Sequence, residues 1–521
     1  MVPHVTDSFT GAEPRGGRRA LPQRPDRSAL RDRATRAVRR ERDSLGAHDV
    51  PAGALYGLFT ERARETFQLT GRPPHPALIR GYGRVKKAAA RVNARLGLIP
   101  PRWARAIEWA ADQVIDGRVA DVSVVDALHA GAGTPVHMNV NEVVANLANE
   151  RLGGRRGRYE PIHPNDHVNL GQSSNDVTPT AIRLMALELR QGLVRELGEL
   201  ERAFRTLARR ERTVVKAGRT HLQDAVPITY GQVFAGYAES IRAARTAFFA
   251  ATDELRVVGL GGTAVGTGIT AHPRFQRLVV RELSRVTRER LVAAVTPVTT
   301  TWSLRPLASC SAALRGIALD LVKICVDLRL LASGPHTGFA ELRLPEVEPG
   351  SSIMPGKVNP SVPEAVQMAA FQVIAYDHAV ALAAAAGELE LNVMTPLVAL
   401  DLGDAFDLLT RALALLRERA VAGIVVNRER VAQLVAGSLV EATALSPYLG
   451  YPMTAELVKD ALARGRAFRD VVVERGLVDV DTLRRLLRPA ALTSPQKIDV
   501  RLRRQLQRAP AYRALAARLR R

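Results

Sequence analysis

The stretch 349–360 concentrates side chains that could carry out chemistry together. Its sequence, PGSSIMPGKVNP, holds Ser351, Lys357 and Asn359 in a frame of glycine and proline residues. Glycine permits positive φ and proline fixes φ, so this composition predicts an ordered loop without regular secondary structure. A phosphate-binding P-loop is excluded, because the two glycines are one residue too far apart and Val358 stands where Ser or Thr is required. The loop can instead present a hydroxyl, an ammonium group and an amide to one small anion.

Three other clusters of small polar residues precede predicted helices. They contain Thr134, Ser173, Ser174, Asn175, Thr220 and His221. A glycine-rich turn before a helix leaves N–H groups unpaired, and these suit a carboxylate. Each cluster also has a simpler structural interpretation, because Gly-Thr turns are common, Ser and Asn cap helices, and a single histidine is usually structural.

The stretch from Gly350 to Pro360 resembles the signature of the aspartase/fumarase superfamily. The three polar clusters resemble the same superfamily in order and spacing, and so do the segments 41–57 and 75–90. The resemblance covers about residues 41–490 and leaves both ends of the chain outside it. It implies a homotetrameric lyase that removes an amine or water from a four-carbon acid and releases fumarate.

The resemblance also implies roles for the candidate residues. Ser351 would remove a proton from the carbon beside a carboxylate, and His221, charged by Glu364, would contact the substrate. Serine is a poor base at its ordinary pKa, so backbone N–H groups or Lys357 would have to stabilise the Ser351 oxyanion. The dianionic intermediate needs several preorganised donors and a positive charge. The residues implied to bind substrate are Thr134, Ser173, Ser174, Asn175, Thr220, Lys357 and Asn359. No metal and no organic cofactor is implied, and each site would be built from three subunits.

The sequence mixes features of two subfamilies. Ala132 and the dipeptide Pro363-Glu364 resemble aspartate ammonia-lyases, whereas the segment 163–166, Ser174 and Gly356 resemble class II fumarases. Ala132 lacks a hydroxyl that would help to hold a water, which weakens hydration more than deamination. We therefore expect conversion of L-aspartate to fumarate and ammonia, with class II fumarate hydratase as the alternative.

Two alternatives come from other classes of protein. A serine hydrolase built on Ser351 and His221 would lack the G-x-S-x-G elbow and would leave Lys357 without a role. A non-catalytic descendant could bind nucleic acid through its basic ends, but the candidate catalytic residues are all retained. His137 and His336 replace the Asn and Arg usual in the superfamily, and could adapt the pocket to a related amino-dicarboxylate.

Long helices are expected to hold these clusters in place. Apolar residues at three- and four-residue spacing predict amphipathic helices, and stretches rich in Ala and Leu predict longer ones that pack as a bundle. The predicted helices are 77–96, 102–116, 138–149, 231–256, 312–331, 363–386 and 397–421, and another starts near residue 180. Such helices carry their ends far apart, so clusters at those ends meet more easily between copies of the chain than within one.

We therefore expect a mainly α protein with the three-domain fumarase/aspartase-like fold, in which a long central helical bundle forms the tetramer core. The expected parts are a disordered Arg-rich extension (1–40), an N-terminal lyase domain (41–178), the central bundle (179–425), a small C-terminal helical domain (426–490) and a basic tail (491–521).

Composition narrows the function classes further. The net charge of +22 is carried mainly by arginine, but no aromatic residues are interleaved as in a nucleic-acid reader, so we expect no nucleic-acid partner. The same charge would attract a dianionic substrate. Cys310 and Cys325 lack metal-ligand spacing and predict a reduced, cytoplasmic protein. No stretch is expected to reach the roughly 18–20 apolar residues of a membrane span. The segment 259–264 fits a dinucleotide-binding pattern, but we expect no strand before it and therefore no nucleotide cofactor.

Overall fold

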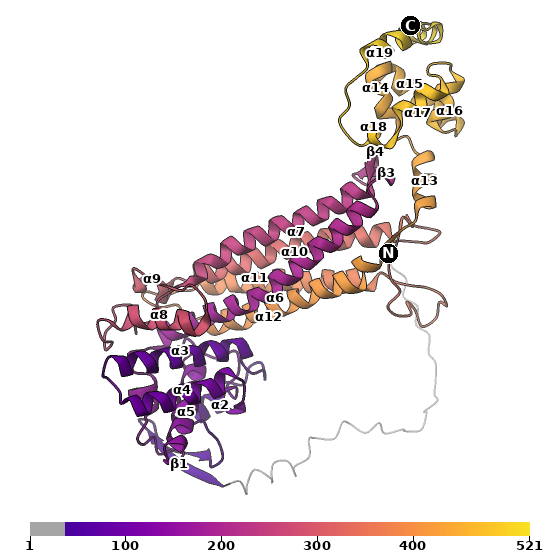
Figure 1. Ribbon diagram of the computed structural model, residues 1–521. Coiled ribbons are helices and arrows are strands. Elements are labelled where there is room, and N and C mark those ends of the chain that lie inside the picture. Colours follow the sequence, from indigo (N-terminus) through magenta and orange to yellow (C-terminus); the bar gives the residue numbers. More distant parts are fainter. Residues whose placement is uncertain (1–36, 521) are drawn as a thin grey trace, which may run out of the picture.

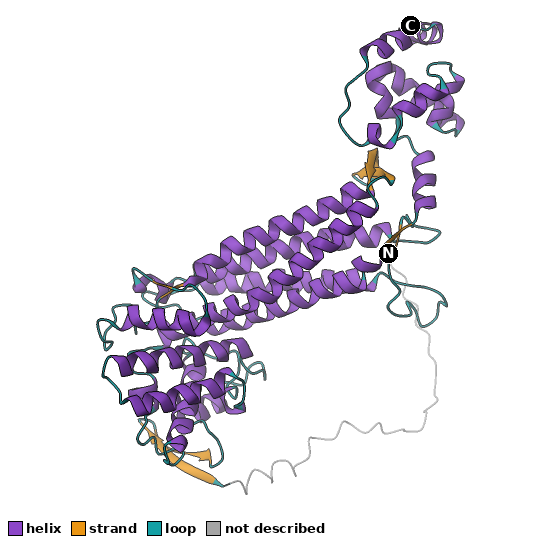
Figure 2. Ribbon diagram, viewed as in Figure 1, coloured by secondary structure: helices purple, strands orange, loops and turns teal. Residues whose placement is uncertain are grey.

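The computed structural model describes residues 37–520, which form three helical regions, with the two end regions projecting to opposite sides of the central bundle (Figures 1 and 2). An N-terminal region lies at one end, a bundle of long helices occupies the middle, and a small C-terminal module lies at the other end. The strands form only two-stranded sheets within the described residues. The expected mainly α, fumarase/aspartase-like fold is confirmed.

The N-terminal region begins with an antiparallel hairpin and continues as four helices. Its elements are β1 (Val38–Asp43), β2 (Gly46–Pro51), α2 (Leu58–Thr66), α3 (Pro76–Arg95), α4 (Pro101–Ile115) and α5 (Thr134–Arg151). The helices predicted over 77–96 and 102–116 are confirmed as α3 and α4. The expected extension 1–40 lies mostly outside the described residues, and its boundary was wrong because residues 38–40 belong to β1. Arg39 holds this strand in place, donating to the carbonyls of Pro51 (2.9 Å) and Ala54 (2.7 Å).

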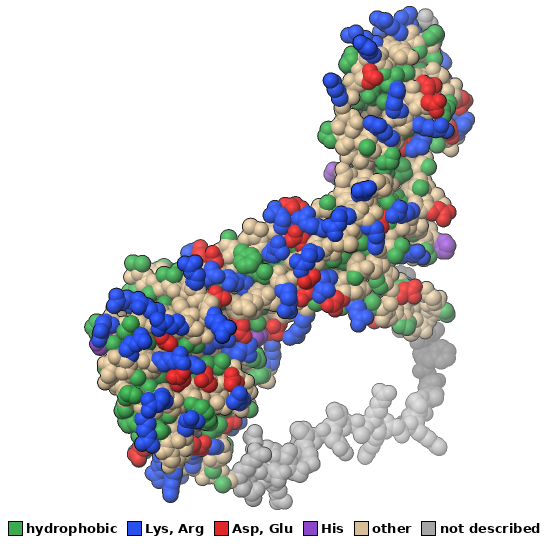
Figure 3. All heavy atoms as spheres, viewed as in Figure 1, with side chains coloured by type: hydrophobic (Ala, Val, Ile, Leu, Met, Phe, Trp, Pro, Cys, Tyr) green, Lys and Arg blue, Asp and Glu red, His purple; other side chains and the backbone are tan. Residues whose placement is uncertain are grey.

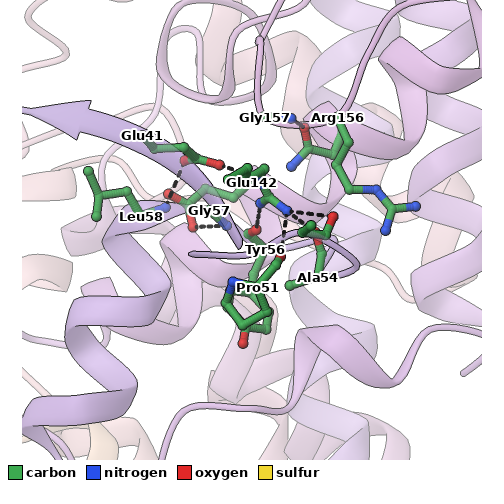
Figure 4. A network of polar contacts seen from close by, with 12 residues as sticks. Glu41, Pro51, Ala54, Tyr56, Gly57, Leu58, Glu142, Arg156 and Gly157 are labelled. Carbon is green, nitrogen blue, oxygen red and sulfur yellow. Dashed lines mark hydrogen bonds and ion pairs between the residues drawn. The ribbon is translucent and has the colours of Figure 1, made fainter. Parts of the chain in front are cut away.

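Buried carboxylates hold the start of α2. Glu142 of α5 accepts hydrogen bonds from the N–H groups of Gly57 (2.9 Å), Phe59 (3.0 Å) and Thr60 (3.2 Å) and from the Thr60 hydroxyl (2.6 Å). Glu41 accepts from the N–H of Leu58 (2.9 Å), and both carboxylates point at this turn (Figure 4). The first N–H groups of α2 therefore find their acceptors on β1 and α5 rather than on a capping residue of its own.

The central bundle consists of five long helices that carry the largest core. They are α6 (Ser174–Arg210), α7 (Tyr230–Asp253), α10 (Arg305–Leu331), α11 (Ser361–Ala385) and α12 (Thr395–Arg419). The predicted long helices are confirmed, but α6 begins at Ser174 and not near residue 180. Ser173 and Asp176 form a capping box that starts the helix earlier. With 37 residues, α6 spans roughly 55 Å.

Short elements connect the helices of the bundle. They are the hairpin β3 (Val215–Thr220) and β4 (Gln223–Thr229), the parallel pair β5 (Val257–Val258) and β6 (Val292–Ala293), α8 (Phe275–Thr287), α9 (Pro297–Trp302), and the pair β7 (Leu342–Arg343) and β8 (Val425–Val426). Single helical turns occur at Ala120–Val122, Pro164–Val168, Glu254–Arg256 and Val421–Gly423.

The dinucleotide-like segment 259–264 directly follows β5, so the expectation that no strand precedes it was wrong. No helix starts at its glycines. Instead, the N–H groups of Gly261 and Thr263 each donate to the Asp176 carboxylate at 2.9 Å. The amides that could face a phosphate in such a motif are therefore used to attach this turn to the start of α6.

The C-terminal module has a hydrophobic core of its own. Its helices are α14 (Ala442–Leu449), α15 (Tyr451–Arg464), α16 (Phe468–Glu474), α17 (Val480–Leu486), α18 (Pro489–Leu492), α19 (Val500–Arg508) and α20 (Pro510–Leu519). α13 (Arg428–Ala436) leads into the module and packs against β3. Residues 491–521 were expected to form a separate tail. That expectation was wrong for α19, because its Leu502 and Leu506 are buried in this core. The other domain boundaries stay predictions.

One helix of the bundle is unusually apolar on the outside. α11 has 25 residues, and an 18-residue window within it has a mean hydropathy of 1.4, so by length and composition alone it could span a membrane and the expectation of no such stretch was wrong. It packs between α10 and α12, but Met368 (61% exposed), Phe371 (51%) and Leu382 (61%) face outward. Elsewhere, Lys and Arg side chains cover all three regions on the face shown in Figure 3.

Candidate active site

The candidate residues lie at opposite ends of the bundle. Thr134 and Ser174 begin α5 and α6 beside the N-terminal region, whereas Thr220 ends β3 and His221 follows it at the far end of α6 (Figure 1). The loop that carries Ser351 lies between α10 and α11, at this same far end. One chain therefore does not bring the predicted clusters together, as the lengths of its helices led us to expect.

The first group joins the starts of α5 and α6. Gly133 adopts φ 84° before Thr134, and a Cβ there would come within 2.5 Å of Thr178 on α6, so the close approach of the two helices requires glycine. Ser173 Oγ accepts from the N–H of Asn175 (3.2 Å), and Asn175 Nδ2 donates to the Ala264 carbonyl (2.8 Å). Thr134, Ser173 and Ser174 are each partly exposed and lie at the starts of α5 and α6, where the positive ends of the helix dipoles are.

A buried lysine belongs to the same group and was missed from the sequence. Lys86 of α3 is fully buried, and its Nζ lies 2.5 Å from Nε2 of His137, whose Nδ1 lies 2.8 Å from Ser174 Oγ. Its sequence signal is a lysine on the apolar face of an amphipathic helix, three and four residues from Ala89 and Tyr82. Burial lowers the pKa of Lys86 and of His137 well below their usual values.

The second group begins with the β3–β4 hairpin. His221 and Leu222 form its turn with φ of 55° and 59°, and both side chains are exposed. Arg219, next to Thr220, lies 2.6 Å from the fully buried Glu341, which also accepts from the Tyr230 hydroxyl at 2.8 Å. Glu341 lies at the start of the loop that leads to Ser351, so one buried carboxylate anchors both the hairpin and the base of that loop.

The loop 349–360 has the irregular, ordered form that its composition predicts. Ser351 Oγ accepts hydrogen bonds from the N–H groups of Ile353 (3.2 Å) and Met354 (3.1 Å). The loop is closed by Gly350 N–H donating to the Lys357 carbonyl and by Asn359 Nδ2 donating to the Gly350 carbonyl, both at 2.8 Å. The Ser351 oxygen thus lies where two backbone dipoles favour a negative charge.

Lys357 and Asn359 line a groove of about 840 Å³ between the loop, β7 and β8. The loop itself is exposed, including the apolar side chains of Ile353 (83% exposed) and Met354 (48%). Polar candidates and exposed apolar residues thus lie together in one exposed loop, a combination typical of an interaction surface.

Glu364 is not paired with His221 in the structure. Its carboxylate lies 3.4 Å from Nη2 of Arg329, on the neighbouring helix α10. Glu364 lies in the first turn of α11, where α10 packs alongside, so Arg329 is the partner that a single chain offers. The expected charging of His221 by Glu364 stays a prediction for the assembly.

Comparison with known proteins supplies the family. Residues 46–375 match the family model described as Lyase, and residues 442–494 match the model described as Fumarase C C-terminus. The chain belongs to the aspartase/fumarase superfamily. It is a lyase by this membership.

Similar proteins cover nearly the whole length of this superfamily member. The aspartate ammonia-lyase of Pseudomonas fluorescens is 44% identical over 471 residues, which are 89% of this chain and 98% of that protein. A class II fumarate hydratase of Bradyrhizobium diazoefficiens is 42% identical over 90% of this chain and 99% of that protein. The cobalt-bound crystal structure of a fumarate lyase:delta crystallin from Brucella melitensis has a TM-score of 0.86 and 44% identity, covering 88% of this chain and 100% of that one.

Proposed function

We propose that this lyase converts L-aspartate to fumarate and ammonia, reversibly. The observation that carries the proposal is the setting of Ser351, whose Oγ accepts two backbone N–H groups in a loop that also holds Lys357 and Asn359. This arrangement fits a base that removes a weakly acidic proton beside a carboxylate. The similarity to several aspartate ammonia-lyases at 41–44% identity supports aspartate as the substrate.

In the proposed mechanism, Ser351 in its alkoxide form takes the proton from the carbon beside the carboxylate that becomes the dianionic centre. Lys357, Asn359 and the donors at the starts of α5 and α6 would stabilise the charge on that carboxylate. The amine then leaves with its bonding electrons, and the double bond of fumarate forms. His221 would contact a substrate carboxylate.

The substrate would be a small dicarboxylate, and the site would be shared between subunits of a homotetramer. The separation of the two groups along α6, which spans roughly 55 Å, supports a shared site. The outward apolar face of α11 supports assembly through the bundle. The free, buried cysteines support a reduced, cytoplasmic environment.

Class II fumarate hydratase is the second candidate. It is favoured by the 42% identity to such an enzyme and by the segment 163–166. Ala132, which is 4% exposed and carries no hydroxyl, disfavours it.

The proposal is tested by incubating the purified protein separately with L-aspartate and L-malate and following the ultraviolet absorbance of fumarate. Fumarate from aspartate alone is the expected result. Fumarate from malate alone would establish the second candidate. No fumarate from either substrate would contradict the proposed lyase activity.

A further inference from the structure

In the buried cluster around Lys86, each polar side-chain atom that contacts the lysine amine has a hydrogen-bond partner. Lys86 Nζ lies 2.5 Å from His137 Nε2, 2.9 Å from Gln172 Oε1 and 3.1 Å from Asn169 Oδ1. It is fully buried, as is His137, while Gln172 is 8% exposed. These three neighbours fix the position of the buried Lys86 amine.

The two amides can only accept from Lys86. Asn169 Nδ2 donates to the Gln172 carbonyl (3.3 Å), and Gln172 Nε2 donates to the Val168 carbonyl (3.1 Å). These bonds place both side-chain oxygens toward the amine. Two N–H groups of Lys86 are therefore committed, and only the third position on its nitrogen is free to differ between protonation states.

That third position faces His137. An ammonium donates its third N–H to Nε2, so the neutral imidazole carries its proton on Nδ1 and donates to Ser174 Oγ. A neutral amine instead offers a lone pair to an Nε2 proton, and Nδ1 then accepts from the Ser174 hydroxyl. His137 also stacks on Tyr82, with ring centroids 5.7 Å apart. This packing holds the imidazole in one orientation, so only these two hydrogen-bond patterns are open to it.

Charged groups around the cluster decide which state is populated. Burial lowers the pKa of Lys86, whereas the negative charge of Asp176 acts in the opposite direction and is the smaller effect. Asp176 is itself buried, which raises its pKa to about 6, while the N–H groups of Ser173, Gly261 and Thr263 stabilise its charged form. Tyr82 faces His137 from α3, with its hydroxyl donating to Thr178 at 2.8 Å. With Asp176 ionised above pH 6, the ammonium of Lys86 has a counter-charge within the same buried cluster.

We propose that Lys86 and His137 are positioning residues that set the direction of the Ser174 hydroxyl, so that protonated Lys86 makes Ser174 a hydrogen-bond donor toward the substrate. The protonated lysine makes His137 donate to the Ser174 oxygen, which leaves the Ser174 hydrogen free to point out of the cluster. Loss of one proton from Lys86 reverses both bonds. Ser174 then offers only lone pairs to the site, which repel a carboxylate.

This inference rests on the proposed function, because Ser174 must face a substrate carboxylate for its direction to matter. It makes His137 more than a replacement for the Asn usual in the superfamily. An asparagine has one fixed donor and one fixed acceptor, whereas an imidazole can exchange them between its two ends.

The test measures binding of succinate, an unreactive dicarboxylate, by calorimetry from about pH 6 to about pH 11, a range that includes the ordinary lysine pKa and values well below it. For the natural protein we expect the Kd to rise by about tenfold across the Lys86 transition, the effect of losing one hydrogen bond to a charged group. KM for the reactive substrate should rise with it, while kcat changes less.

Two variants and one matched control test the hydrogen-bonded series Lys86–His137–Ser174, here called the relay. His137→Asn and Lys86→Met should both lose the alkaline rise in Kd. Tyr82→Phe alters the same buried packing but leaves every atom of the relay, and it should keep the natural profile.

A His137→Asn profile that superimposes on that of the natural protein would overturn the proposal, as would failure of succinate to bind the natural protein. Because succinate binding needs no turnover, a protein that forms no fumarate yet shows the pH-dependent binding would contradict the proposed function alone. Fumarate formation combined with unchanged pH profiles would contradict this inference alone.

Discussion

Ser351 is an ordinary hydroxyl whose surroundings give it a candidate catalytic role. Its Oγ accepts from two backbone N–H groups, and the same loop carries the Lys357 ammonium and the Asn359 amide. The two N–H groups favour the alkoxide over the neutral alcohol. In the assembled site, this residue should decide whether the carbon–hydrogen bond breaks.

We expect Ser351→Ala to lower kcat by about 10²- to 10⁴-fold, which is the usual contribution of a positioned base. The measurement is the initial rate of fumarate formation from L-aspartate. Ser352→Ala is the matched control, since that side chain is adjacent and exposed, and it should keep most of the activity. A Ser351→Ala enzyme that turns over at the natural rate would remove Ser351 from the mechanism.

The sequence predicts residues that carry their chemistry in a local pattern, and it misses residues whose role depends on distant partners. The loop 349–360 is recognisable because its glycines, prolines and polar groups are consecutive. Lys86 looks like one of two adjacent surface lysines, yet Lys87 pairs with Asp112 at 2.7 Å while Lys86 is buried among groups from α5 and the turn before α6. Only the packing of α3 distinguishes the two.

At the scale of elements, helix starts are set by side chains from other parts of the chain. Glu142 of α5 accepts three N–H groups and one hydroxyl at the start of α2. Nothing within 58–66 shows this, because α2 has no side-chain cap of its own. The start of α6 was missed for a related reason. Its capping residue Ser173 lies inside a polar cluster that was interpreted first as chemistry.

Glu142 also gives a pH prediction. Burial raises the pKa of Glu142 to about 7 from 4.5, so the folded protein binds this proton more tightly than the unfolded chain. The contribution of this group to stability is therefore greatest below about pH 4.5 and falls as pH rises to about 7. We expect Glu142→Gln, which cannot ionise, to gain in unfolding midpoint relative to the natural protein between about pH 5 and about pH 8.

Thermal unfolding at a series of pH values measures this difference. Glu65→Gln is the control on α2, the helix whose start Glu142 holds, because the Glu65 side chain is half-exposed and its carboxylate pairs with His48 at the surface. It should show no such trend. A Glu142→Gln protein that loses stability relative to the natural one as pH rises would show that the four donors outweigh burial.

At the scale of the whole molecule, a single chain leaves an apolar surface exposed and keeps the candidate residues at two separate ends of the bundle. Met368, Phe371 and Leu382 are exposed on α11, although that helix is otherwise packed in the bundle. The periodicity of the long helices predicted the bundle. It could not show which faces remain open, because that depends on how α10 and α12 cover α11.

We expect the double variant Met368→Glu, Leu382→Glu to break the proposed tetramer and abolish fumarate formation, because each buried charge in an interface core costs several kcal/mol. Sedimentation velocity measures the oligomeric state of the same preparation that is assayed. Leu69→Glu is the control, since Leu69 is 69% exposed in a loop before α3. An active monomer would contradict both the assembly and the shared site.

The central claim is that the two ends of the bundle meet between copies of this chain to form one lyase site. Mixing subunits with defects at opposite ends tests it most directly. Ser351→Ala and Thr134→Ala proteins, each expected to be strongly impaired alone, are dissociated together, reassembled and assayed for fumarate from L-aspartate. Recovery of activity in the mixture is predicted, because some sites then combine an intact loop from one chain with an intact helix start from another. Reassembled mixed oligomers without activity would contradict the account.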